Sequence, residues 1–187
     1  MRYDPYKHRR QSMRLSEYDY RLPGAYFVTI CTEYRECIFQ DEAVKALIEQ
    51  SWRAVGKYAL EATRDEFVVM PNHVHGIIWI DPRIGNLVPK PKSVHPVVEP
   101  GSLGAIVRAF KSTVTKRVNR RRQAPGLPVW QRGYHERIIR TDRELANVRQ
   151  YIRDNPAKWE NDPDNPRNGS ADTDAVGRST SDSGRPS

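Results

Sequence analysis

The sequence predicts a single α+β domain in which helices pack on a largely antiparallel sheet. Three observations lead to this class. The length of 187 residues suits one domain with a hydrophobic core. Strand-like and helix-like segments alternate in the order β-α-β-β-α-β-α. Two of the strand-like segments follow one another through the short connection Pro71-Asn72, as antiparallel neighbours do.

The first half of the domain contains three of the strands. Residues 25–32 follow the turn signal LPG and are rich in β-branched and aromatic side chains, which predicts a strand. Residues 41–58 place apolar side chains at helical spacing behind an acidic first turn, so we expect a helix there. Residues 60–70 and 73–80 are predicted to be the strands on either side of the Pro-Asn connection.

The second half adds two helices and one strand. Residues 103–122 carry a stripe of apolar side chains at helical spacing, and residues 134–140 have the composition of a short strand. The last helix is expected to begin at Thr141, because Glu144 three residues later completes a capping box.

The segments around and within this domain are polar. Residues 1–20 are basic and rich in tyrosine, and we expect an extended arm. Residues 81–101 contain five prolines and are predicted to be a loop. Residues 161–187 have no aromatic and few aliphatic side chains, so they are predicted to be a disordered tail. The folded domain is therefore placed at residues 21–160.

The overall charge favours an anionic partner. Lys and Arg total 31 against 23 Asp and Glu, a formal charge of +8. Nucleic acid is the first candidate and an anionic membrane surface the second, although a merely soluble basic protein is also compatible. The two cysteines, Cys31 and Cys37, form no CxxC pair and suit a reducing compartment. With no signal-peptide or membrane-spanning pattern, we expect a cytoplasmic protein without a membrane partner.

Two histidines at the start of a predicted strand form a candidate metal site. In a strand, side chains two residues apart point to one face and lie about 6.5–7 Å apart. His73 and His75 would therefore offer two imidazoles to one divalent ion, while Val74 packs on the opposite face. The absence of a nearby cysteine disfavours a thiolate zinc site. The alternative is that both histidines are polar residues on a solvent-exposed face.

The last helix carries a candidate third ligand and a candidate nucleophile. Tyr151 and Asn155 are four residues apart and lie on one helical face, just before the helix-ending Pro156. The Asn155 amide could complete a His-His-Asn metal site. A tyrosine hydroxyl with a pKa near 10 is a poor nucleophile, but a metal ion that polarises a phosphate makes its attack feasible. The alternative is that Tyr151 is a packing residue beside the apolar stripe.

Residues 101–140 contain ten Arg or Lys and one acidic residue, Glu136. Such cations track phosphates, and nearby aromatic side chains stack on bases, as single-stranded nucleic acid binding requires. A solvated helix face is the alternative. The residues expected to contact DNA are Arg108, Lys111, Arg117, Arg120, Trp130, Arg132 and Arg137.

Three segments in this order, MPNHVHGIIWI, VWQRGYHERIIR and YIRDNPAKW, resemble the single-tyrosine HUH transposases with an IS200-like domain, most closely the REP-associated tyrosine transposases. The resemblance spans about residues 20–160. It implies a ferredoxin- or RRM-like sheet with His73-Val74-His75 on a central strand. It further implies Tyr151 as the nucleophile and Asn155 as the third ligand of Mg²⁺ or Mn²⁺.

The resemblance also implies the reaction. Its members cleave single-stranded DNA beside an imperfect hairpin, leave a 5′-phosphotyrosine and a free 3′-OH, and can rejoin strands. They include monomers and dimers, and a DNA-bound member would be found at the nucleoid. Residues 81–101 look like an insertion in this pattern, and the tail after residue 160 lacks the basic or aromatic side chains that a substrate role would need.

Three other functions compete with this one. A non-catalytic RRM-like protein that binds single-stranded nucleic acid would share the sheet and the charge, and an inactive transposase remnant would share the motifs. A histidine-triad nucleotide hydrolase would need a third histidine at position 77, which is isoleucine.

Overall fold

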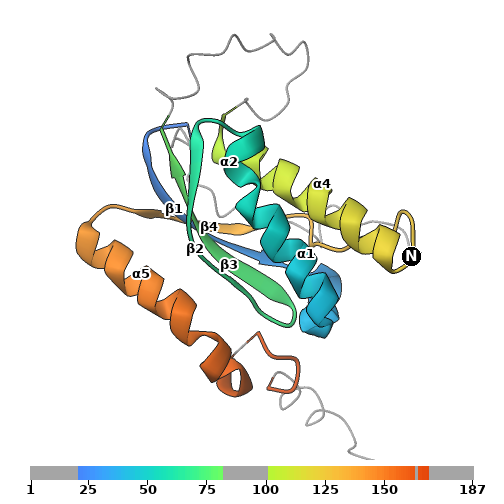
Figure 1. Cartoon of the computed structure of the whole chain (residues 1–187). Helices are drawn as coiled ribbons and strands as arrows, with labels where there is room; N and C mark the ends of the chain where they lie inside the picture. The colour runs from blue at the N-terminus through green and yellow to red at the C-terminus, as the bar shows by residue number, and fades with distance from the viewer. Residues whose placement is uncertain (1–20, 82–100, 163, 169–187) are drawn as a thin grey trace, which may run out of the picture.

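The computed structural model describes residues 21–81, 101–162 and 164–168 (Figure 1). The predicted arm 1–20 lies outside the described residues, as do most of the predicted loop 81–101 and residues 169–187 of the predicted tail. The elements follow in the order β1 (Gly24–Cys31), α1 (Glu42–Arg53), α2 (Val55–Tyr58), β2 (Ala62–Val69), β3 (His73–Ile80), α4 (Leu103–Arg121), β4 (His135–Ile139) and α5 (Asp142–Asp154), with short 3-10 helices at Glu33–Arg35, Ile38–Gln40 and Pro156–Asn161.

The sheet has the strand order β2-β3-β1-β4, and every neighbouring pair is antiparallel. This confirms the predicted α+β class and places the histidine strand β3 in the middle of the sheet. One difference from the prediction concerns residues 41–58, which form two helices. The backbone nitrogen of Ala54 donates to the carbonyl of Ser51, three residues back, so α1 ends in a turn and α2 begins at Val55.

Helices cover both faces of the sheet (Figure 1). On one face, α1 and α4 bury the larger apolar cluster, which includes Val74, Trp52 and Phe110. On the other face, α5 buries a smaller cluster that includes Ile77 and Ile152. Successive side chains of β3 therefore pack into the two clusters in turn. His73 and His75 lie on the same face as Ile77, which is the face covered by α5.

Gly76 lets the sheet approach the helix layer closely. A Cβ atom at this position would lie 2.5 Å from Cη2 of Trp52. The Trp52 ring stacks on Phe67 at a centroid distance of 4.3 Å, and so it is held in place over β3. The glycine that follows the two histidines is thus required by packing.

The C-terminal turn at residues 164–168 lies beyond the predicted end of the domain at residue 160. The backbone carbonyl of Asp164 accepts a hydrogen bond from the Asn72 side chain at 2.6 Å, and the Asp164 carboxylate pairs with Arg35. The turn is held by polar contacts rather than by apolar burial, which explains why composition predicted disorder there.

No helix in the described ranges is both long and apolar enough to cross a bilayer.

Candidate metal and nucleophile centre

The two histidines of β3 are buried side by side beneath α5. His73 is fully buried and His75 is 4% exposed. Their Nε2 atoms lie 3.0 Å apart. Val74 packs in the core on the opposite face, as predicted. The alternative of two solvent-exposed polar residues is therefore wrong.

The other ring nitrogen of each histidine is fixed by a neighbouring side chain. Nδ1 of His73 lies 2.8 Å from Oδ1 of Asn72. The Asn72 orientation is settled because its Nδ2 donates to two backbone carbonyls, those of Arg35 at 3.2 Å and Asp164 at 2.6 Å. Since Oδ1 can only accept, His73 carries its proton on Nδ1 and presents a lone pair on Nε2.

His75 has an equivalent support from the neighbouring strand. Thr29 pairs with His75 across β1 and β3, and its hydroxyl lies 2.8 Å from Nδ1 of the imidazole. When this hydroxyl accepts a hydrogen bond from Nδ1–H, His75 keeps its lone pair on Nε2, 3.0 Å from Nε2 of His73. Two neighbouring side chains thus orient both imidazoles for a shared ligand.

Burial keeps both imidazoles neutral. Desolvation lowers the pKa of His73, and the carboxylates of Asp164 and Asp162 only partly oppose the shift. Desolvation, followed by the proximity of His73, lowers the pKa of His75 to about 3. Neutral imidazole is the form that binds a metal ion, so both residues are prepared as ligands at physiological pH.

Asn155 supplies a buried oxygen without a hydrogen-bond partner. The residue caps the C-terminal end of α5 and is 3% exposed. Among the described residues, its Oδ1 atom accepts no hydrogen bond. An unsatisfied buried acceptor costs about 1–3 kcal/mol, which a cation at this oxygen would offset.

The donor set fits the metal implied by the resemblance. Two imidazole nitrogens and one amide oxygen suit Mn²⁺ or Mg²⁺, and the remaining positions around such an ion are usually filled by water and phosphate oxygens. In the described part of the chain, no group of three or more His, Cys, Asp or Glu side chains could hold an ion. The candidate site therefore depends on the Asn155 amide.

Tyr151 stands at the edge of this cluster. Its side chain is 46% exposed, and its hydroxyl lies 3.4 Å from Nε2 of His75. The ring meets those of Phe27 and His75 edge-on, at centroid distances of 6.0 and 5.3 Å. Partial burial raises the pKa of Tyr151, while the Asn155 amide opposes the shift. The hydroxyl is thus protonated at neutral pH and accessible from solvent.

A groove of about 620 Å³ opens onto this hydroxyl between the sheet and α5. Phe27 and Thr29 of β1 form part of its floor, and Arg137 and Arg143 contribute positive charge. Tyr151 and His75 both line it. Tyr151 thus packs against Phe27 and His75 and is at the same time partly exposed in this groove, so its role stays a prediction.

The residues expected to contact DNA fall into two groups. The first group is exposed: Arg108, Arg120 and Arg132 form no ion pair with an acidic side chain in the described part of the chain, and Arg137 lines the groove beside Tyr151, where it forms an ion pair with Glu144.

The other three are committed to contacts within the chain. Lys111 donates to the carbonyls of Gln131 and Gly133, and burial lowers its pKa to about 8. Arg117 binds Ser51 and Gln50 of α1 at 3.0 and 2.6 Å.

Trp130 is only 7% exposed and packs edge-on against Phe39 at a centroid distance of 5.0 Å. This placement does not fit the base-stacking role that we expected for Trp130, and the contacts of Lys111 and Arg117 favour structural roles over phosphate binding. Phe27 and Tyr151 are the aromatic residues that line the groove between the sheet and α5.

Sequence reasoning missed the two residues that orient the histidines. Asn72 was interpreted only as a turn residue, although its position directly before His73 was a usable signal. Thr29 lies 46 residues from His75, and only the strand register brings the two together.

Comparison with known proteins identifies the family and the fold. A family model described as "Transposase IS200 like" matches residues 24–155. An uncharacterized protein of Haemophilus influenzae (strain Rd) is 36% identical over 168 residues, which cover 83% of this chain and 92% of that protein. The solved structure of a REP-associated tyrosine transposase bound to a REP hairpin has a similar fold, with a TM-score of 0.54 and 19% identity. The match covers 79% of this chain and 74% of that one.

Proposed function

The chain belongs to the IS200-like transposase family, and we propose that it is a metal-dependent single-stranded DNA endonuclease and strand transferase that cleaves beside a hairpin through a 5′-phosphotyrosine. One observation carries this proposal. The Nε2 atoms of His73 and His75 lie 3.0 Å apart, and the hydroxyl of Tyr151 lies 3.4 Å from Nε2 of His75. Asn155, four residues after Tyr151, adds a buried oxygen without a hydrogen-bond partner among the described residues.

The chain's own residues have separate roles in the proposed reaction. His73, His75 and Asn155 would hold Mg²⁺ or Mn²⁺, which supplies polarisation of a phosphate oxygen. Oη of Tyr151 attacks the phosphorus of the scissile phosphate, the bond from phosphorus to the 3′ oxygen breaks, and the phenolic proton leaves to water in the open groove. The 3′ oxygen takes a proton from water and leaves as a hydroxyl. Attack by a 3′-OH on the phosphotyrosine, with release of the tyrosine, reverses the reaction.

The proposed substrate is single-stranded DNA that carries an imperfect hairpin. The fold is shared with a transposase whose structure contains a REP hairpin. In this chain, the groove beside Tyr151 is lined by Arg137 and Arg143, which could contact a phosphate backbone. We further propose that the protein acts in the cytoplasm, at the nucleoid, as a monomer or a homodimer.

The decisive experiment is covalent trapping. The full chain is incubated with Mg²⁺ and hairpin DNA from the flanks of its own gene, and a protein–DNA adduct is detected by denaturing electrophoresis. Tyr151→Phe should abolish the adduct and retain hairpin binding, because the ring stays and only the hydroxyl is lost. Unchanged cleavage by Tyr151→Phe would refute the mechanism. Binding without any adduct in the unmodified protein would support the non-catalytic alternative or an inactive remnant.

A further inference from the structure

Three polar side chains of α5 form a line along the groove between the sheet and this helix. Arg143, Asn147 and Tyr151 all line the groove, all three are exposed, and they follow one another at intervals of four residues. Side chains at this interval lie one above the other on a helix. The line therefore leads from the nucleophile towards the N-terminal end of α5.

We propose that Asn147 reads one unpaired base beside the scissile phosphate, and that this base is adenine. The proposal rests on the proposed function and deepens it, because it names a nucleotide next to the bond that Tyr151 attacks. The Asn147 amide bonds to the edge of the base, the Phe27 ring packs against the base, and Arg143 binds the next phosphate. Asn147 is thereby a specificity-determining residue of the reaction.

Most other polar groups of the groove already have partners within the chain. The hydroxyl of Thr29 lies 2.8 Å from Nδ1 of His75. Arg137 pairs with one carboxylate oxygen of Glu144, and a backbone N–H at the start of α5 donates to the other oxygen at 3.0 Å. The hydroxyl of Thr141 accepts from the first turn of α5 at 3.1 Å. These groups shape the groove and leave base reading to another side chain.

Asn147 has its full hydrogen-bonding capacity free. In the described part of the chain, no hydrogen bond or ion pair engages its side chain. An amide carries donors on its nitrogen and an acceptor on its oxygen, side by side. Arg143 is likewise without an ion pair among the described residues, but a guanidinium group offers donors only and suits a phosphate.

The chemistry of the amide selects the base. An asparagine side chain forms two hydrogen bonds with adenine at once, because it accepts from the amino group and donates to a ring nitrogen. Unpaired bases leave their edges open to such contacts, whereas paired bases do not. The exposed Asn147 amide therefore fits a single strand better than a duplex, as its place beside Tyr151 requires.

Phe27 supplies an apolar surface for the same base. Its ring is half-buried and lines the groove. It stacks with His75 at a centroid distance of 5.3 Å and meets Tyr151 edge-on at 6.0 Å. Aromatic rings of this kind bind unpaired bases by stacking. Since the ring that supports the base also contacts the nucleophile, the base and the scissile phosphate would be aligned together.

The spacing along α5 suits consecutive nucleotides. One helical turn separates Tyr151 from Asn147 and another separates Asn147 from Arg143, an advance of about 6 Å each. Neighbouring phosphates of an extended single strand are separated by a similar distance. A strand with its scissile phosphate at Tyr151 would therefore present a flanking base at Asn147 and its next phosphate within reach of the long Arg143 side chain.

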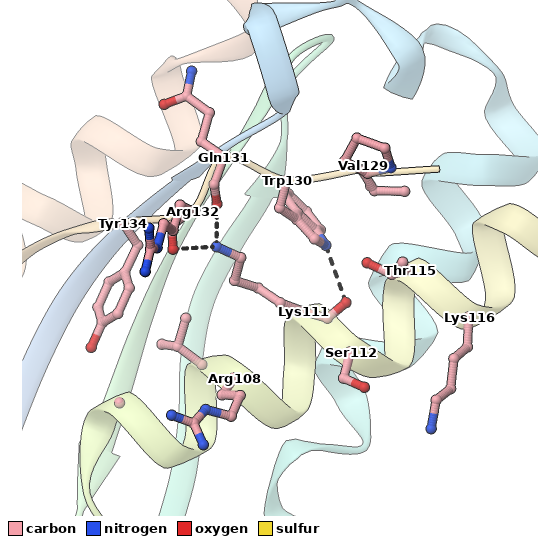
Figure 2. A pocket seen from close by; sticks show the side chains of 13 residues that line it. Arg108, Lys111, Ser112, Thr115, Lys116, Val129, Trp130, Gln131, Arg132 and Tyr134 are labelled. Atoms are coloured by element: carbon pink, nitrogen blue, oxygen red, sulfur yellow. Dashed lines mark hydrogen bonds between the residues drawn. The ribbon is translucent and has the colours of Figure 1, made fainter. Parts of the chain in front are cut away.

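A second groove of similar size offers no such amide. It lies between α4 and the segment that leads into β4, and its volume is about 610 Å³ (Figure 2). Its Trp130 ring is buried and donates from Nε1 to the carbonyl of Lys111 at 3.2 Å. Figure 2 shows the side chain of Gln131 pointing away from α4. Base reading is therefore assigned to the groove beside Tyr151.

The test compares three variants of the full chain. Asn147→Ala removes the amide, and Asn147→Asp keeps its shape but leaves only acceptors. The matched control is Gln150→Ala, which removes an exposed amide from the same helix outside this groove, where it bonds to Asp154. Circular dichroism establishes folding, which alanine at an exposed helical position should preserve.

The first measurement is the rate of adduct formation with Mg²⁺ and hairpin DNA from the flanks of the gene. The cleaved bond is mapped with the unmodified protein, and each of the two flanking bases is then varied in turn. We expect adenine at one of these positions to react about tenfold faster than the other bases. Asn147→Ala should reduce this ratio to less than about threefold, while Gln150→Ala should retain it. Asn147→Asp should favour cytosine instead, because a carboxylate accepts from its amino group.

Equal rates for all bases with the unmodified protein would overturn the proposal, as would an adenine preference that Asn147→Ala leaves unchanged. Loss of the preference in Gln150→Ala as well would assign it to the helix as a whole and have the same consequence.

The second measurement separates this proposal from the proposed function. Fluorescence anisotropy without metal compares labelled hairpins that carry a short unpaired extension of dA, dC or dT. If the unmodified protein forms no adduct with any base, the chemistry is refuted and affinity decides the base reading. Tighter binding of the dA extension, lost in Asn147→Ala, would support Asn147 as the reader. Equal affinities for the three extensions would refute it.

Discussion

Asn72 is predicted to control metal affinity without being a ligand. It is fully buried, and it connects Nδ1 of His73 to the carbonyls of Arg35 and Asp164. Asn72→Ala removes all three hydrogen bonds and leaves the buried Nδ1 proton of His73 unsatisfied. The imidazole is then free to rotate or to move its proton to Nε2, and either change removes the lone pair from the metal site.

The expected size of the effect follows from these contacts. A net contribution of about 0.5–1.5 kcal/mol for each of three hydrogen bonds gives a loss of about 1.5–4.5 kcal/mol in the free energy of unfolding. Loss of a side chain that orients a metal-binding histidine weakens metal affinity by about 10- to 100-fold. Mn²⁺ affinity is measured by electron paramagnetic resonance or calorimetry, and stability by urea denaturation.

A matched control separates the two effects. Asn119 is also a buried asparagine, and its Nδ2 donates to the carbonyl of Leu127 at 2.8 Å, far along α4 from the histidines. Asn119→Ala should lower stability and leave Mn²⁺ affinity unchanged. If Asn72→Ala binds Mn²⁺ as tightly as the unmodified protein, the hydrogen bond to His73 does not orient the ligand and the reasoning is refuted.

Three further predictions follow from other contacts. Gly76→Ala should lower the free energy of unfolding by about 1–3 kcal/mol, because a Cβ would meet the Trp52 ring; an unchanged urea midpoint would contradict this. The pKa of His75 is about 3 in the folded protein against an ordinary 6.5, so the unfolded chain binds a proton at a higher pH than the folded protein does. The free energy of unfolding should therefore fall as the pH drops below about 6.5. Urea titrations with EDTA present should show a flatter pH dependence for His75→Gln. Asp65→Asn should weaken the contact with Arg149 that holds α5 on β2. Adduct formation should then be slower, while hairpin affinity stays unchanged. An unaltered rate of adduct formation would show that this pair does not position the helix.

Much of the fold follows from local pattern. The strand His73–Ile80 has the predicted bounds, directly after the Pro-Asn connection, and the Thr141 hydroxyl accepts from the backbone nitrogen of Glu144 as a helix cap should. The other half of the predicted capping box differs, because the Glu144 carboxylate accepts from the backbone nitrogen of Arg140 rather than of Thr141. Spacing along one element also placed Tyr151 and Asn155 on one face, and this half of the centre could be predicted.

What could not be predicted depends on contacts between elements. Lys111 and Arg117 lie on α4 among exposed cations, and only the positions of neighbouring segments reveal that their charges are already used. Trp130 was predicted to stack on bases because the sequence does not show that its ring is buried. Thr29 became visible only through the pairing of β1 with β3. A periodic pattern tells which side of a helix is apolar, but it does not tell which polar side chains a neighbouring segment will engage.

The division of the centre between two layers has a consequence for ionic strength. The histidines belong to the sheet, whereas Tyr151 and Asn155 belong to α5, and that helix is fastened by ion pairs from Arg149 to Asp65 and from Arg153 to Glu66 around a small apolar patch. Dissolved salt screens partly exposed pairs of this kind. Added salt would therefore loosen the alignment of nucleophile and ligands in protein that is already loaded with DNA, so the turnover of the bound complex should decline with salt independently of any loss of affinity.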